Sequence, residues 1–436
     1  MNRKIELIIK SEVFSIIFVA ISFLLSFILK NNINSYARTL FNEFYRQEKV
    51  DILFCGASHI SHGINPQIAD SMLNASTYNT GTPSQRIEAT YAIIEQAIKL
   101  YDLKKIYLEI DFAVVSTTSF KDSKGFKANY IVGENIKDLK VKYNLYKTMS
   151  SPKYYLNHIL PIGKDKMISL NPKDIVNKIR AIISGAYYRV EYSNEDTIYA
   201  GKGCVMDLNS IEDGTFSNNS FEKPIPIKDF VEDWKSMIKK IINKCEEKKI
   251  ELVFFSMPQS DFYLNEKSNF DDFHFYIKNF LAENNYDYYD FCLANPDILP
   301  LKDHHYSDDN HLSKDGVELW TNVFCKWASG EISDEEMFFS SYEENMKKMA
   351  SQIFGLILSL EQDTNNLKIT SIDNNNSNDV ITYDVNYIID GETIPVAINS
   401  RENTFSMPSN KTLTVEVFSY LNDKQQNHCK EIFTVF

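Results

Sequence analysis

The chain has 436 residues, which is too long for a single hydrophobic core, so two or three domains are expected. Hydrophobic residues make up 44% of it, which is sufficient for globular folding, and the formal net charge of −13 argues against nucleic acid or an anionic membrane surface as the main partner. The six cysteines form no C-x-x-C pair, which excludes a zinc framework and a small disulfide scaffold. We expect them to be buried as small hydrophobic side chains.

Residues 13–29 form an uncharged apolar run of 17 residues, which as a helix would be about 25 Å long and near the lower limit for crossing a bilayer. We predict a cytoplasmic N-terminus over residues 1–12, a transmembrane anchor over 13–30 and a short amphipathic stalk over 31–48. A buried helix of a soluble domain is the alternative, and Ser35-Tyr36-Ala37 offers a weak cleavage site. Basic residues are balanced on the two sides, so the orientation follows from the short N-terminal end, which usually stays in the cytoplasm. The rest of the chain is then extracytoplasmic.

Residues 49–330 show the alternation of strands and helices that is typical of an α/β domain with a parallel sheet. Its first part contains a strand, a turn-rich loop, a helix and a strand, over 51–55, 78–85, 86–100 and 105–112. The pattern breaks at about 114–227, where we predict a large irregular insertion that acts as a lid or substrate-binding cap. It resumes with helices and strands over 230–248, 250–256, 271–284, 288–291 and 314–327.

The C-terminal part has a different pattern. Residues 331–364 are charged and suggest a helical linker, whose apolar run 353–360 could pack on the preceding domain. Residues 365–436 alternate between apolar and polar residues, with turns rich in Asn, Asp, Ser and Gly. This pattern predicts a small antiparallel β-sandwich.

Ser58 follows the strand at 51–55 directly, where a parallel sheet presents functional groups at the carboxyl ends of its strands. Gly56 and Ala57 leave the backbone beside this serine uncrowded. A serine becomes a nucleophile when a base accepts its proton and a third group orients that base. A serine after a strand is, however, also common as a turn residue or a helix N-cap.

Far downstream, Asp308 and His311 stand three residues apart in a polar loop before a helix. We predict that His311 is the base and that Asp308 orients it, although such residues are often only solvated or capping. The loop with Asn79 and Gly81 suits an oxyanion hole together with the Ser58 amide, because glycine allows a close backbone approach and asparagine donates N–H. The alternative for this loop is a simple βα turn.

His59 and Asp111 are further candidates for the pocket, and Asp111 could instead cap a helix. The histidines at 59, 62, 304 and 305, with Asp308 and Asp309, could also bind a metal, but their spacing matches no zinc signature. We therefore expect no metal and no cofactor.

The order Ser58, Gly81, Asp308, His311 resembles the SGNH/GDSL hydrolase superfamily, over residues 51 to about 327. The first block reads Gly56-Ala57-Ser58-His59 instead of G-D-S, and Glu109-Ile110-Asp111 stands where the family has G-x-N-D. With the anchor, the layout is similar to the membrane-anchored branch, which includes D-alanyl-lipoteichoic acid biosynthesis proteins (DltD) and alginate-type polysaccharide O-acetyltransferases.

The resemblance implies a flavodoxin-like three-layer fold and a serine acyl-transfer enzyme outside the cytoplasm. It would transfer O-acetyl or D-alanyl esters to a cell-surface polysaccharide or teichoic acid, with a membrane-bound O-acyltransferase as partner. A carbohydrate esterase would use the same residues. Two other hypotheses remain: a non-catalytic subunit that binds or assembles an envelope polymer, and a metal-dependent phosphoesterase.

Overall fold

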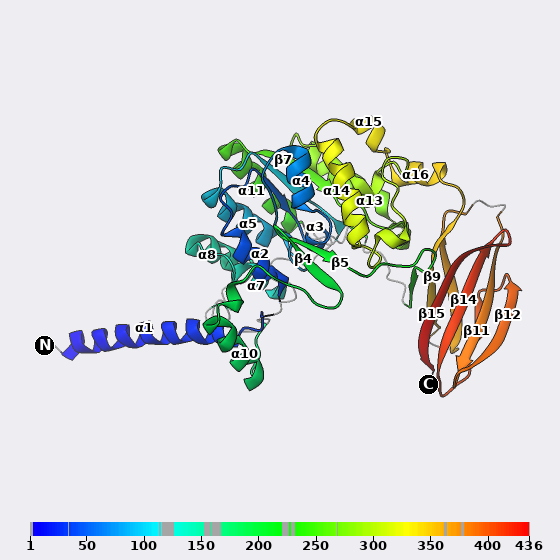
Figure 1. The fold of residues 1–436 in the computed structure, drawn as a ribbon, viewed down its shortest axis with the longest axis horizontal. Coiled ribbons are helices and arrows are strands. Elements are labelled where there is room, and N and C mark those ends of the chain that lie inside the picture. Colours follow the sequence, from blue (N-terminus) through cyan, green and yellow to red (C-terminus); the bar gives the residue numbers. More distant parts are fainter. Residues whose placement is uncertain are drawn as a thin grey trace. The chain divides into compact units, whose positions relative to one another are not determined.

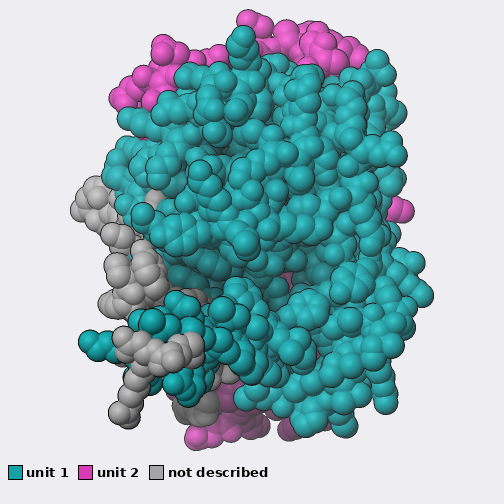
Figure 2. All heavy atoms as spheres, turned by 90° about the vertical axis from the view of Figure 1, so that its left-hand side faces the viewer, with its two compact units in different colours: residues 1–205, 230–254 teal, residues 206–229, 255–436 magenta. Residues whose placement is uncertain are grey.

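The computed structural model describes residues 3–33, 35–112, 115, 126–151, 158, 167–219, 226–227, 232–267, 269–361, 364–375 and 379–435 (Figure 1). The chain divides into two compact units, coloured separately in Figure 2. Unit 1 comprises residues 1–205 and 230–254, and unit 2 comprises residues 206–229 and 255–436.

Unit 1 begins with helix α1 (Arg3–Leu29), and most of its apolar side chains are exposed. One helix in the described part of the chain, α1, is long and apolar enough to cross a membrane, although signal sequences share these properties. Helix α2 (Tyr36–Phe44) follows, and Leu40, Phe41 and Phe44 on it are buried. The predicted stalk is therefore wrong for this segment, because its apolar face packs into the core of unit 1.

Five strands form one sheet in the order β2-β1-β3-β7-β8. Their bounds are β1 (Ile52–Cys55), β2 (Thr77–Asn79), β3 (Lys105–Glu109), β7 (Glu251–Ser256) and β8 (Tyr288–Asp290). Strand β1 pairs in parallel with β2 and with β3, which brings their carboxyl ends to one edge. The predicted parallel α/β sheet is confirmed, but the edge strand β2 falls partly in the segment predicted to be a loop. Three residues are too few to show a strand periodicity.

The helices of the α/β part are α3 (Ser58–Ser61), α4 (Pro66–Leu73), α5 (Ile87–Leu100), α11 (Asp233–Lys248), α12 (Asp261–Lys267), α13 (Phe270–Ala282) and α14 (Lys314–Ala328), with short 3-10 turns at Phe291–Leu293 and Asp303–His305. Four of these helices, α5, α11, α13 and α14, agree closely with predicted segments, and the shorter helices α3, α4 and α12 were not predicted. In unit 1, α5 packs against α11. All six cysteines are buried, as expected.

The segment predicted to be an irregular insertion contains regular structure. It holds α7 (Phe126–Gly133), α8 (Leu139–Thr148), α10 (Pro172–Ile183), a 3-10 turn (Ala186–Tyr188), β4 (Thr197–Gly201), β5 (Cys204–Asp207) and β6 (Ser217–Asn218). Helices α7 and α8 pack on α5, so this part of the segment belongs to the core of unit 1. Other parts of it lie outside the described residues, and its role as a lid stays a prediction.

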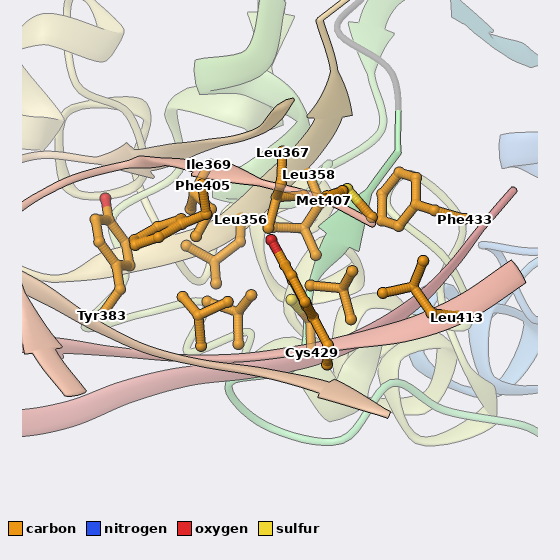
Figure 3. Packing of buried hydrophobic residues seen from close by; sticks show 14 of the residues in the cluster. Leu356, Leu358, Leu367, Ile369, Tyr383, Phe405, Met407, Leu413, Cys429 and Phe433 are labelled. Atoms are coloured by element: carbon orange, nitrogen blue, oxygen red, sulfur yellow. The ribbon is translucent and has the colours of Figure 1, made fainter. Parts of the chain in front are cut away.

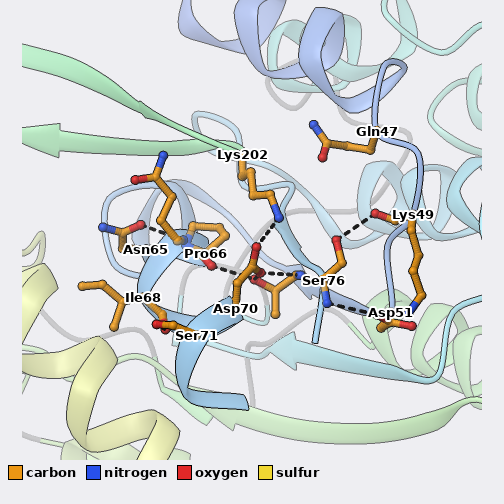
Figure 4. A network of polar contacts seen from close by, with 12 residues as sticks. Gln47, Lys49, Asp51, Asn65, Pro66, Ile68, Asp70, Ser71, Ser76 and Lys202 are labelled. Carbon is orange, nitrogen blue, oxygen red and sulfur yellow. Dashed lines mark hydrogen bonds and ion pairs between the residues drawn. The ribbon is translucent and has the colours of Figure 1, made fainter. Parts of the chain in front are cut away.

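A network of polar contacts fixes the start of β2 beside β1 (Figure 4). Asp70 on α4 accepts hydrogen bonds from the backbone N–H and the hydroxyl of Thr77, at 2.6 and 2.8 Å, and pairs with Lys202. Asp51 accepts the Ser76 N–H at 3.0 Å and pairs with Lys49 at 2.8 Å. These contacts help to fix the register of β2 against β1, and therefore the position of Asn79 at the end of β2.

Two four-stranded sheets at the end of unit 2 enclose a common apolar core (Figure 3). Their orders are β13-β10-β9-β6 and β12-β11-β14-β15, with bounds β9 (Ile353–Leu360), β10 (Asn366–Asp373), β11 (Ile381–Ile389), β12 (Glu392–Ser400), β13 (Thr404–Ser406), β14 (Lys411–Leu421) and β15 (Lys424–Val435). The predicted β-sandwich is present.

Its start was predicted wrongly. In the described part of residues 331–364, the short helices α15 (Asp334–Met337) and α16 (Tyr342–Lys348) are followed by the apolar run, which forms strand β9 within its sheet. The side chains of β9 are buried from Ile353 to Leu358, because both faces of the strand are covered. A continuous apolar run of this length fits a buried strand as well as a helical segment, so periodicity could not separate the two.

We expect Leu356→Ala to lower the free energy of unfolding of the sandwich by about 2–5 kcal/mol, because Leu356 is fully buried and its truncation leaves a cavity. Ile398→Ala on β12 is the control, since Ile398 is 76% exposed, and we expect a change within about 0.5 kcal/mol. Urea unfolding of the full chain measures both, and an equal effect of the two substitutions would contradict this core.

Candidate functional site

Ser58 lies where the sequence predicts, just beyond the carboxyl end of β1, as the first residue of the short helix α3. It is partly buried, and the residues around it are buried. The Ala57 N–H donates to Oε2 of Glu109 on β3 at 3.1 Å. A Cβ on Gly56 would overlap the Glu109 carboxylate and Ile60, so glycine at this position lets the turn pass close to β3.

Asn79 and Gly81 make different contacts from those of an oxyanion hole. The buried Asn79 side chain donates both amide hydrogens to the carbonyl oxygens of Ile60 and Ile64, and its Oδ1 accepts the Gly81 N–H at 3.0 Å. A Cβ on Gly81 would overlap the backbone at Ala57. Both residues therefore position the turn that carries Ser58, and these hydrogen bonds occupy the donors that were predicted to stabilise an oxyanion.

His59 occupies a buried polar cluster that the sequence analysis recognised only in part. Its Nδ1 lies 3.2 Å from Oε1 of Glu109 and 3.0 Å from Oδ2 of Asp111, and the side chains of all three residues are at least nine-tenths buried. The pocket candidates His59 and Asp111 are thus brought together, and Glu109 is the member that was missed. The position of Glu109 at the end of an apolar strand could have indicated its role, because β3 pairs in parallel with β1, the strand that leads to Ser58.

Electrostatics favours a charged imidazole in this cluster. Burial lowers the pKa of His59, but the hydrogen bonds to Asp111 and Glu109 outweigh it and raise that pKa well above its usual value. Burial also raises the pKa of Glu109, against the hydrogen bond from His59. A positive imidazole between two carboxylates supplies the charge compensation that buried carboxylates require.

A metal is the other cation that such a cluster could hold. In the described part of the chain, His59, Glu109 and Asp111 are the group whose ligand atoms lie within 4.8 Å of one another. The 3.2 Å contact with Glu109 has the geometry of a hydrogen bond, and the 3.0 Å contact with Asp111 is an ion pair of the protonated imidazole. A charged His59 accounts for both contacts, and no metal is needed to compensate the two carboxylates. The other histidines named above do not join it.

Asp308 and His311 form a hydrogen-bonded pair in unit 2. Nδ1 of His311 lies 2.8 Å from Oδ2 and 3.1 Å from Oδ1 of Asp308. The same carboxylate accepts the backbone N–H groups of Asn310 at 3.0 Å and His311 at 2.7 Å. Partial burial raises the pKa of Asp308, but the hydrogen bond with His311 and these backbone donors outweigh it and lower the pKa to about 2. The carboxylate therefore stays ionised and holds a proton on Nδ1.

The loop that carries this pair is fastened at both ends. Ser260 donates its hydroxyl to the Asp309 carbonyl, and Ser307 donates its backbone N–H to the His311 carbonyl at 2.9 Å. The Ser313 side chain caps the start of α14. A Cβ on Gly316 would overlap the His305 carbonyl, so this glycine lets α14 begin close to the loop.

Two other histidine–carboxylate pairs in unit 2 make a useful comparison. His274 lies 2.8 Å from Asp290, but Asp290 also accepts the Ser256 hydroxyl, so the carboxylate separates the serine from the histidine, and all three are buried. His304 lies 2.8 Å from the exposed Asp213. Among these pairs, Asp308 with His311 has both carboxylate oxygens within 3.1 Å of Nδ1, an arrangement that can orient a catalytic imidazole.

Ser58 belongs to unit 1, and the Asp308–His311 pair belongs to unit 2. The structure thus brings together two members of the predicted triad, and the contact between Ser58 and His311 stays a prediction. A scan against protein-family models and a search of curated proteins gave no match to this chain. The resemblance to SGNH hydrolases therefore depends on the residues alone.

We expect His59→Gln to destabilise the protein by about 3–5 kcal/mol, because it leaves two buried carboxylates without a cation. A raised histidine pKa gives stability that is complete below the unfolded value of about 6.5 and is lost as the pH rises through the folded value. The difference between wild type and variant should therefore shrink as the pH rises above about 6.5. Urea unfolding at a series of pH values measures it.

His428→Gln is the matched control for this prediction. His428 lies 3.2 Å from Glu416, as His59 does from Glu109, but its side chain is 34% exposed. We expect an effect below about 1 kcal/mol. Equal effects of the two substitutions would show that the buried cluster contributes no more than a surface pair.

We expect Asn79→Ala to lower the stability by roughly 3 kcal/mol, because two buried carbonyls and the Gly81 N–H lose their partner. Asn322→Ala is the control, since Asn322 is exposed and donates to the Glu318 carbonyl. Thermal unfolding of the full chain compares them. Unchanged stability with esterase turnover reduced on the order of 10²–10³-fold would instead restore the oxyanion role of Asn79.

Proposed function

We propose that this protein is a membrane-anchored serine acyl-transfer enzyme of the SGNH type, in which Ser58 is the nucleophile, His311 the base and Asp308 its orienting group. The observation that carries the proposal is the double contact of the ionised Asp308 carboxylate with Nδ1 of His311, 2.8 and 3.1 Å away. With a proton held on Nδ1, Nε2 is the nitrogen that acts as base.

The reaction would proceed in two steps. Nε2 of His311 takes the Ser58 hydroxyl proton while Oγ attacks the carbonyl carbon of an acyl ester, and the alcohol leaves with the proton from the imidazolium. A hydroxyl of the acceptor polymer, or water, then gives its proton to His311 and attacks the Ser58 ester, the bond between the acyl carbon and Ser58 Oγ breaks, and the imidazolium returns its proton to Oγ. Transfer and hydrolysis differ only in this acceptor. Asp308 stabilises the imidazolium in both steps.

A cavity of about 360 Å³ in unit 2 is the proposed place for part of the substrate. Tyr306, which precedes the dyad loop, lines it together with the carboxylates of Asp261 and Asp303 and the apolar side chains of Leu299 and Phe354. Carboxylates accept hydrogen bonds from hydroxyl or amino groups, and apolar walls suit the faces of sugar rings. Asp308 and His311 do not line this cavity, so its use by a hydroxyl-rich polymer is part of the proposal.

The length and apolar composition of α1 support placement of the enzyme at the cell membrane, and the location of the remaining chain outside the cytoplasm is part of the proposal. A membrane-bound O-acyltransferase is the proposed supplier of acyl groups. The alternative of a non-catalytic subunit for an envelope polymer makes the opposite prediction for the reactivity of Ser58, so one experiment separates the two.

We expect the full chain in detergent to react with a fluorophosphonate probe and to hydrolyse a chromogenic acetyl ester. Ser58→Ala should abolish the labelling, and Ser58→Ala and His311→Ala should each reduce turnover on the order of 10⁴-fold or more, because the members of a triad act as a unit. Asp308→Asn should have a similar effect, since the amide favours the wrong tautomer of His311.

Matched substitutions test whether these effects belong to the triad. Ser71 is an exposed serine on α4, and His304 forms a 2.8 Å pair with Asp213, so Ser71→Ala and His304→Ala should leave turnover nearly unchanged. A folded wild-type chain that neither labels nor turns over the ester would contradict the proposal and favour the non-catalytic alternative.

A further inference from the structure

Helix α10 is tied to the end of the apolar helix α1 by backbone hydrogen bonds. The Asn31 N–H donates to the Met167 carbonyl at 2.9 Å, and the Ser169 N–H donates to the Leu29 carbonyl at 2.8 Å. Since α10 begins at Pro172, it is held where α1 ends, as Figure 1 shows. The end of α1 is thereby part of the folded structure of unit 1.

One face of α10 is fixed inward by a buried lysine. Lys178 is 1% exposed, and its ammonium group donates to the Lys30 carbonyl at 2.7 Å and to Oδ1 of Asn32 at 3.0 Å. The same group lies 5.0 Å from the ring centre of Phe27, near the end of α1. Because a buried cation must keep these partners, the contacts of Lys178 fix the rotation of α10 about its own axis.

The opposite face of α10 is an exposed apolar stripe. Val176, Ile179 and Ile183 follow one another at spacings of three and four residues, and they are 44%, 39% and 81% exposed. Leu170, just before the helix, is 68% exposed. Residues at this spacing share one side of a helix, so the stripe is continuous. Exposed apolar side chains that form a continuous surface usually indicate an interaction site.

Two basic residues border this stripe. Lys173 and Arg180 are exposed and seven residues apart, so they lie on one line along the helix. An apolar stripe bordered by basic residues is the pattern of helices that lie in the membrane interface. The net charge of −13 belongs to the whole chain and does not oppose a local contact of these two side chains with phosphates.

We propose that α10 is an in-plane membrane helix. Its apolar stripe (Val176, Ile179 and Ile183) enters the boundary between lipid headgroups and acyl chains, next to the point where α1 leaves the bilayer. Lys173 and Arg180 contact lipid phosphates. The occupant is a lipid surface and not a protein, because the stripe continues from the end of a helix that itself belongs in lipid.

The consequence is a second attachment of unit 1 to the membrane. A single anchor helix leaves the attached domain able to rotate and tilt. An adjacent helix with its long axis in the membrane plane restricts both motions, and it presents one fixed side of unit 1 to the bilayer. This proposal depends on the insertion of α1 and not on catalysis by Ser58, so Ser58→Ala should leave it unchanged.

Tryptophan substitution in the full chain, reconstituted into phosphatidylcholine vesicles with brominated acyl chains, tests the proposal. We expect quenching of Ile183→Trp at least about twofold greater than that of Asn177→Trp, because the stripe would lie about 5–10 Å deep in the interface. Asn177 is exposed on the other side of the same helix and is the matched control. The unsubstituted chain gives the background of the three native tryptophans.

Each other outcome has a definite meaning. Phe18→Trp in α1 should be quenched by bromine at the bilayer centre, and its absence would overturn the proposal together with its premise. Equal quenching at positions 177 and 183 would overturn the in-plane helix alone. A blue-shifted but unquenched Ile183→Trp would assign the stripe to a protein surface. Circular dichroism shows that each variant is folded.

Discussion

A histidine held between two buried carboxylates is the interaction on which the arrangement around Ser58 depends. His59 comes from the turn after β1, and Glu109 and Asp111 come from the end of β3 and the residues beyond it. Burying these charges singly would cost several kcal/mol, so the two strand ends are stable only when they face each other. Because Glu109 also accepts the Ala57 N–H, the turn that delivers Ser58 is joined to this cluster.

Asn79 and Gly81 act on the same turn from the opposite neighbour, β2. The Asn79 amide holds two carbonyls beyond Ser58, and the missing side chain of Gly81 allows the backbones to meet. Strands β2 and β3 flank β1, so the Ser58 turn is restrained from both sides of its strand. A residue positioned by backbone contacts on two sides has little conformational freedom to lose on reaction, and this preorganisation is the condition for efficient nucleophilic attack.

The elements with a strong hydrophobic periodicity were predictable from the sequence. The candidate site residues that follow or precede these elements, such as Ser58 and His311, were predictable as well. Strands β1, β3 and β7 and helices α5, α11, α13 and α14 agree with the sequence patterns because each buries a continuous apolar face, whereas the shorter elements α3, α4, β2 and α12 were missed. Glu109 was not recognised, since its partner His59 is 50 positions away and no local pattern records a pairing across a sheet. The apolar run of β9 could not be distinguished from a helical segment, because a strand buried on both faces does not alternate.

Helix α10 shows a different limit of sequence reasoning. Its large apolar residues (Ile175, Val176, Ile179, Ile182 and Ile183) recur at helical spacing on one side of the helix, so the sequence carries a helical pattern that the interpretation of residues 114–227 as irregular missed. Only the contacts of Lys178 with the chain just after α1 reveal which side faces inward. Burial, with a smaller contribution from the nearby Lys30, lowers the pKa of this lysine to about 7, which makes a charged side chain at this position costly. An uncharged residue would remove that cost but also the contacts that set the rotation of α10, and with it the direction of the exposed stripe.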